Sequence, residues 1–137
     1  MSQGAAQIAP SQALVEENTA MLSSFEQQGM RLDQEVWMDF IAEFPDPELA
    51  ESALGAAERM VKAAGTLPTA RFEILVDDAD ETAEPVYELR LTTRVLPEAA
   101  IISTFEALLT RVSTMYGGST AAWEFADPTN TTMEALQ

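Results

Sequence analysis

The side chains that could carry out chemistry in this chain are almost all carboxylates. Its 137 residues include 23 acidic and seven basic residues, with no histidine and no cysteine. Without histidine the chain lacks the side chain that titrates near neutral pH without special tuning, and without cysteine it lacks a thiolate nucleophile and a soft metal ligand. The chemistry left to consider is acid–base hydrolysis by paired carboxylates, or the binding of a hard cation by clustered ones.

A carboxylate pair is available on segment 36–44, where Asp39 and Glu43 fall on the same face of a predicted strand. Hydrolysis by such a pair requires a cleft in which burial raises the pKa of one carboxyl group. Nothing in a sequence so rich in acids singles out one pair. We therefore expect no catalytic residues and no enzymatic activity. The enzymatic alternative is a hydrolase that depends on Asp39, Glu43, Glu73 or Glu88.

The densest group of acids could suggest a calcium site, and it comprises Asp77, Asp78, Asp80, Glu81 and Glu84. Counted from Asp78, an EF-hand loop would need glycine where the chain has Ala83 and a bidentate glutamate where it has Leu89. The spacing argues against an EF-hand. We expect this segment to be the solvated tip of a hairpin, and we expect no metal and no other cofactor.

The net charge indicates the class of partner. The formal charge at pH 7 is −16. Nucleic-acid affinity depends on neutralising phosphates with lysine and arginine, so contact with RNA or DNA would be repulsive on balance. We expect a basic, arginine-rich protein partner and no direct binding of nucleic acid.

The sequence pattern predicts neither a membrane span nor an export signal within residues 1–137. No apolar run approaches the ~20 residues that a transmembrane helix needs, and residues 1–10 lack the basic start and apolar stretch of a signal peptide. We expect a cytoplasmic protein with no membrane partner.

Hydrophobic periodicity divides the chain into elements that would position these acids. A helix is predicted over 11–28, capped by Ser11 and ended by Gly29, and its apolar stripe comprises Leu14, Met21, Leu22 and Phe25. Period-two alternation predicts strands over 36–44, 71–76, 87–92 and 121–125. Apolar residues at helical spacing predict two more helices, one over 46–64 capped by Asp46 and one over 97–116 opened by Pro97.

The order of elements predicts the fold class. After the first helix it reads strand, helix, strand, strand, helix, strand, which is typical of α+β domains with the ferredoxin-like split β-α-β sandwich (βαββαβ). We expect this fold with an extra N-terminal helix, and both later helices on one face of an antiparallel sheet. Residues 11–128 would form a single domain, between a flexible N-terminus (1–10) and a disordered C-terminal tail (129–137). The expected core comprises Phe40, Ile74, Leu89, Ile102, Phe105 and Leu109.

The sheet face without these two helices is the candidate binding site. Alternation places on it the candidate partner-binding residues Trp37, Asp39, Ile41, Glu43, Glu73 and Glu88. Tryptophan offers a cation–π surface and carboxylates accept paired hydrogen bonds from a guanidinium group, so this face suits an arginine-bearing partner. Alternatively, the N-terminal helix, or a second copy of the chain in a homodimer, covers Trp37, Ile41 and Leu75.

Three segments carry a family resemblance. They are Glu16-Glu17-Asn18-Thr19, then Asp46-Pro47-Glu48-Leu49-Ala50, then Tyr116-Gly117 followed by Trp123-Glu124-Phe125-Ala126-Asp127-Pro128. With these segments, and in element order and acidity over residues 14–128, the chain resembles the regulator of ribonuclease E activity B family. It departs from the family pattern where Ala121-Ala122, in place of Tyr-Asp-Gly, precede Trp123.

The resemblance implies a small, acidic, ferredoxin-like regulatory protein of bacterial RNA metabolism. Such a protein would inhibit ribonuclease E by protein–protein interaction, without catalysis, and its implied partner is the arginine-rich scaffold region of that endonuclease. A relative with the same fold and another basic protein partner is the alternative. An immunity or antitoxin-like protein that binds a toxin would be of this kind.

Overall fold

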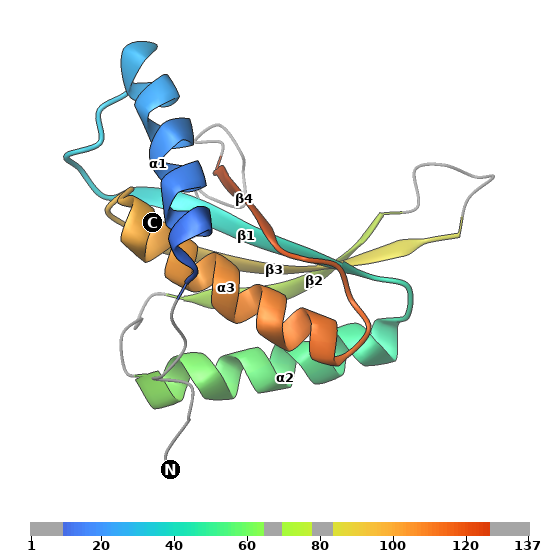
Figure 1. Ribbon diagram of the computed structural model, residues 1–137. Coiled ribbons are helices and arrows are strands. Elements are labelled where there is room, and N and C mark those ends of the chain that lie inside the picture. The colour runs from blue at the N-terminus through green and yellow to red at the C-terminus, as the bar shows by residue number, and fades with distance from the viewer. Residues whose placement is uncertain (1–9, 65–69, 78–83, 127–137) are drawn as a thin grey trace.

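The computed structural model describes residues 10–64, 70–77 and 84–126. These ranges hold three helices and four strands (Figure 1), in the order α1 (Gln12–Gln27), β1 (Val36–Phe44), α2 (Pro47–Ala64), β2 (Arg71–Asp77), β3 (Val86–Val95), α3 (Ala99–Met115) and β4 (Ala122–Phe125). Three predicted segments lie outside the described residues: the flexible N-terminus apart from Pro10, the disordered tail 129–137, and acids 78–83 of the expected hairpin tip.

The four strands form one antiparallel sheet in the order β2-β3-β1-β4. Strand β1 is central: it pairs with β3 over its whole length, from Val36 opposite Val95 to Phe44 opposite Tyr87. On its other side it pairs with the short β4. The expected α+β architecture with an antiparallel sheet is confirmed.

Helices α2 and α3 cover one face of this sheet, as Figure 1 shows. The core lies between the two layers, because alternate residues of β1 and β3 point toward the helices. Of the six expected core residues, Phe40, Leu89, Ile102, Phe105 and Leu109 are buried. Ile74 packs against this core but is only partly buried, since it lies on the edge strand β2.

Most predicted helix ends are confirmed by their capping contacts. The side chain of Ser11 accepts a hydrogen bond from the backbone nitrogen of Leu14 at 3.1 Å, and Gly29 has a φ of 101°. Oδ1 of Asp46 accepts from the backbone nitrogen of Glu48 at 2.8 Å. The prediction that Pro97 opens the third helix was wrong by two residues. Its N-cap is the extended Glu98, because a three-residue turn bonds the nitrogen of Glu98 to the carbonyl of Leu96 before the helix begins.

The N-terminal helix α1 lies on the helix side of the sheet, against α3 and β4. The ring of Phe25 contacts those of Trp123 and Phe125, with centroids 6.3 Å and 5.1 Å apart. Strand register places both β4 aromatics on the core face, opposite Phe40 and Met38. The alternative in which this helix covers the opposite face was therefore wrong. In the predicted stripe, Leu22 is buried but Met21 is 40% exposed.

Candidate protein-interaction face

The sheet face turned away from the three helices, here called the open face, carries all six predicted partner-binding residues. Their positions follow from register: Asp39 lies opposite Thr92, Ile41 opposite Arg90, and Glu43 opposite Glu88. Glu73 of β2 continues the row from Arg90. The open face comprises Trp37, Asp39, Ile41, Glu43, Arg71, Glu73, Leu75, Glu88, Arg90, Thr92, Arg94, Ala122 and Glu124.

Asp39 differs from the other carboxylates of the open face because it is buried and makes its hydrogen bonds inside the protein. Its side chain is 8% exposed. Oδ1 accepts from the hydroxyl of Thr92 at 2.6 Å, and Oδ2 accepts from Nη1 of Arg90 at 3.2 Å. The same guanidinium donates through Nη2 to Glu88 at 3.1 Å. Asp39 and Glu88 thus hold Arg90 between them, and Asp39 is a positioning residue rather than a free acceptor.

The remaining candidates are accessible to a partner. Trp37 and Ile41 are half-buried apolar side chains on the central strand, and Glu43 and Glu73 are exposed carboxylates. Among the open-face side chains that the structure describes, five carboxylates (Asp39, Glu43, Glu73, Glu88 and Glu124) stand against three guanidinium groups (Arg71, Arg90 and Arg94). The face therefore combines two apolar side chains on its central strand with a net negative charge.

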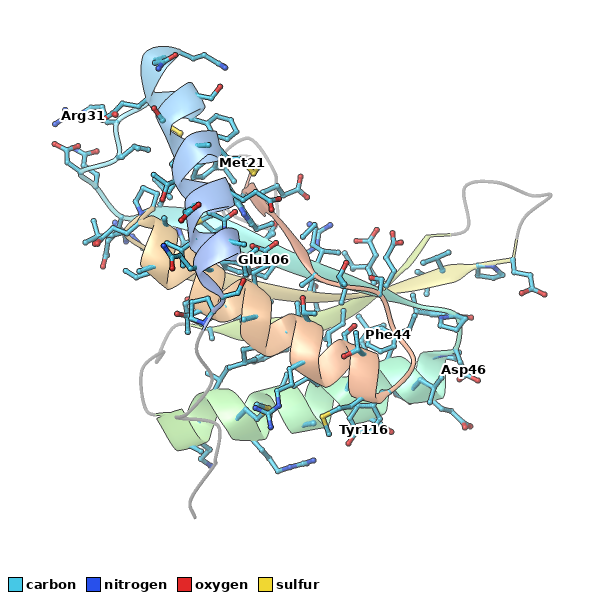
Figure 2. The ribbon with its side chains drawn as sticks, in the orientation of Figure 1. Met21, Arg31, Phe44, Asp46, Glu106 and Tyr116 are labelled. Atoms are coloured by element: carbon cyan, nitrogen blue, oxygen red, sulfur yellow. The ribbon has the colours of Figure 1, made fainter. Side chains whose placement is uncertain are left out.

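Sequence reasoning missed a second polar cluster, buried where α1, α3 and β4 meet. Nδ2 of Asn18 donates to Oγ of Ser103 at 2.8 Å and to Oε1 of Glu106 at 2.9 Å. Oδ1 of Asn18 accepts from Nε1 of Trp123 at 2.8 Å. Figure 2 shows Glu106 at this junction, beside α1. Asn18 and Trp123 both belong to segments that carry the family resemblance, which is the one signal that pointed to them.

Burial changes the acidity of one member of this cluster. Desolvation raises the pKa of Glu106 above its ordinary value of 4.5, and the negative charge of Glu17 raises it further. The hydrogen bond from Asn18 acts in the opposite direction. A raised carboxyl pKa can mark a catalytic acid, but here it has a structural cause, the packing of α1 on α3.

Within residues 10–64, 70–77 and 84–126, no three histidine, cysteine or acidic side chains gather in a way that could hold a metal ion. In the same part of the chain, no helix has both the length and the apolar character needed to span a membrane.

An antiparallel sheet with helices on one face and an acidic, tryptophan-bearing second face defines a small α+β protein. The model of the family described as regulator of ribonuclease activity B matches residues 15–125. The chain belongs to this family. No curated protein matches the sequence.

Proposed function

We propose that this protein is a non-enzymatic regulator that lowers the activity of a ribonuclease by binding an arginine-rich segment of it on the open face. The observation that carries the proposal is the half-buried pair Trp37 and Ile41, flanked by the exposed carboxylates Glu43 and Glu73, on a face that α1, α2 and α3 leave free. Membership of a family of ribonuclease regulators supports the choice of a ribonuclease as target. The binding would take place in the cytoplasm.

The chemistry of the open face supports an arginine-bearing partner. A guanidinium group over the indole of Trp37 would make a cation–π contact. The carboxylates of Glu43 and Glu73 would accept paired hydrogen bonds from other guanidinium groups of the partner. Arg90 already occupies Asp39 and part of Glu88. The contribution of Asp39 is then indirect, by fixing Arg90 and the local charge pattern.

The proposal includes the fold type. The order β2-β3-β1-β4, with two helices on one face, supports a ferredoxin-like sandwich to which α1 has been added. In this arrangement the central strand β1 carries the apolar anchors Trp37 and Ile41, so a partner that lies across the sheet would contact them.

The test measures binding to ribonuclease E from the same organism and inhibition of its RNA cleavage. Trp37→Ala should mainly raise the dissociation rate, because a buried aromatic anchor sets residence time. Glu43→Gln with Glu73→Gln should mainly slow association at low salt, because long-range attraction speeds association there. The effect should be smaller at 0.1 M salt, where screening limits this attraction to a Debye length of ~10 Å.

The matched control is Glu51→Gln with Glu58→Gln, which removes the same charge from exposed positions of α2. It should alter association less than the open-face pair. Binding that does not depend on salt and is unchanged by all three open-face substitutions would exclude this face. Direct RNA binding at physiological salt would contradict the mechanism.

A further inference from the structure

We propose that a second copy of this chain pairs with the outer edge of β2, so that two sheets join antiparallel into one across a twofold axis at Ile74. This inference rests on the sheet edge and is independent of the proposed function. The dimer would use the outer edge of the sheet and the ribonuclease partner its open face, and the two interactions should respond oppositely to salt.

Strand β2 is a regular edge strand. It stands at the end of the order β2-β3-β1-β4 and, within the described residues, pairs only with β3. That pairing runs without a bulge from Arg71 opposite Thr92 to Asp77 opposite Val86. In an antiparallel strand, alternate backbone N–H and C=O groups point to the unpaired side, so a regular edge is a template for another strand.

The edge lacks most of the features that usually prevent such pairing, although Arg71 and Glu73 are charged. Natural edge strands are kept short, bulged, or interrupted by lysine or proline. The opposite edge, β4, has four residues, whereas β2 has seven with neither lysine nor proline. Leu75 is 37% and Val76 55% exposed, so the end of β2 also presents apolar surface.

The exposure of Val76 has a geometric cause. Alternation places Val76 on the helix side, with Phe72 and Ile74. Figure 1 shows the β2–β3 hairpin extending away from the helix layer, so no helix covers this end of the strand. A neighbouring strand would cover Val76 instead.

On the helix side of the sheet, the sequence of β2 is complementary to itself when read antiparallel about Ile74. Phe72 of one copy then lies opposite Val76 of the other, and Ile74 lies opposite Ile74, which makes a continuous apolar row on the helix side. The same register places the basic position 71 of each copy opposite the acidic position 77 of the other copy. This match of residue types favours a second copy over an unrelated extended peptide, and an isologous contact of this kind closes as a dimer.

Antiparallel pairing about a twofold axis normal to the sheet keeps both open faces on the same side. Each copy brings a formal charge of −16, so long-range repulsion opposes the dimer and added salt should strengthen it. Binding of a basic partner would weaken under the same change. The failure of one proposal therefore leaves the other measurable.

Sedimentation velocity over a range of protein concentrations, at low and high salt, tests the dimer. The wild type should dimerise more tightly at high salt. Val76→Lys should weaken the dimer by about tenfold or more, since it places a charge in the apolar row. Met115→Lys is the matched control, because Met115 is an apolar side chain that is 67% exposed and belongs to helix α3 rather than to the sheet edge, and it should leave the dimer unchanged.

A cross-linking measurement covers the case in which Val76→Lys disturbs the hairpin itself. The chain has no cysteine, so a single Ile74→Cys substitution places one thiol per copy at the proposed axis. Mild oxidation should yield a disulfide-linked dimer, whereas Met115→Cys should not. A wild type that is monomeric at every concentration, a dimer unaffected by Val76→Lys, or cross-linking equal at both cysteine positions would overturn the proposal. So would an edge that binds an added extended peptide but no second copy.

Discussion

Nε1 of Trp123 donates a hydrogen bond to Oδ1 of Asn18 at 2.8 Å, joining two residues 105 positions apart. Asn18 is 1% exposed, and its amide also donates to Ser103 and Glu106. One buried side chain thus fixes the first helix to α3 and to the last strand.

Asn18→Ala should lower the free energy of unfolding by about 2 kcal/mol, because it leaves the indole of Trp123 and the hydroxyl of Ser103 without a buried partner. Urea unfolding followed by tryptophan fluorescence measures the loss. Thr19→Ala, an exposed neighbour on the same helix, should change stability by no more than about 0.5 kcal/mol. Equal losses for both variants would show that the polar cluster does not hold α1.

Glu106→Gln should make stability less dependent on pH. Burial raises the folded-state pKa of Glu106 above 4.5, so the folded chain binds this proton more tightly than the unfolded chain. Protonation of Glu106 therefore stabilises the fold, and this contribution is fully present below pH 4.5. It is lost as pH rises through the folded-state pKa. The variant keeps an Oε1 acceptor for Asn18 and cannot ionise.

Thermal unfolding of wild type and Glu106→Gln should be compared from pH 7.5 to pH 4. The variant should have the higher melting temperature at neutral pH, and the difference should shrink as pH falls. A difference that is constant across this range would contradict the assignment.

Gly118→Ala should destabilise the protein by about 1–3 kcal/mol, the usual cost of overpacking. A Cβ atom at this position would lie 2.5 Å from Cε2 of Phe44, a ring that is itself 1% exposed. Figure 2 shows Phe44 at the end of β1, near the end of α3. Gly55→Ala is the matched control: its Cβ would lie 3.4 Å from the flexible end of Arg59, inside helix α2. That change should stabilise by up to about 1 kcal/mol, and denaturant unfolding distinguishes the two signs.

Phe105→Ala should cost about 3–5 kcal/mol in the free energy of unfolding, as expected for a buried aromatic residue. Its ring packs against that of Phe40 with centroids 5.3 Å apart, which joins α3 to the central strand. Met115→Ala, at the exposed end of the same helix, should be close to neutral. A loss below about 1 kcal/mol for Phe105→Ala would show that this helix face is not part of the core.

The elements that could be predicted from sequence are those whose signals are local. Period-two alternation predicts β1 with its observed ends, Val36 and Phe44, and the pair Asp46-Pro47 predicts the start of α2. The position of α1 could not be predicted in the same way. An apolar stripe predicts that a helix packs on some surface, but it does not identify that surface, because both sheet faces carry apolar residues. In the structure, Phe25 of this stripe contacts Trp123 and Phe125.

The candidate site was predicted in outline and not in its internal contacts. Alternation is enough to place Trp37 and Glu43 on one face. It cannot show that Asp39 is already held by Thr92 and Arg90, because that depends on the register between β1 and β3. Asn18 gives even less signal, since its partners are 85 to 105 positions away in the chain.

The contact of Phe25 with Trp123 and Phe125 has a consequence for synthesis of the protein on the ribosome. Chains emerge with their N-terminal residues first, so α1 leaves the exit tunnel well before its aromatic partners on β4 have been translated. Until then the aromatic part of its native surface is missing, although α3 has already been translated. Nascent chains stalled before Trp123 should therefore expose this helix to chaperones, and its docking should be among the last steps of folding.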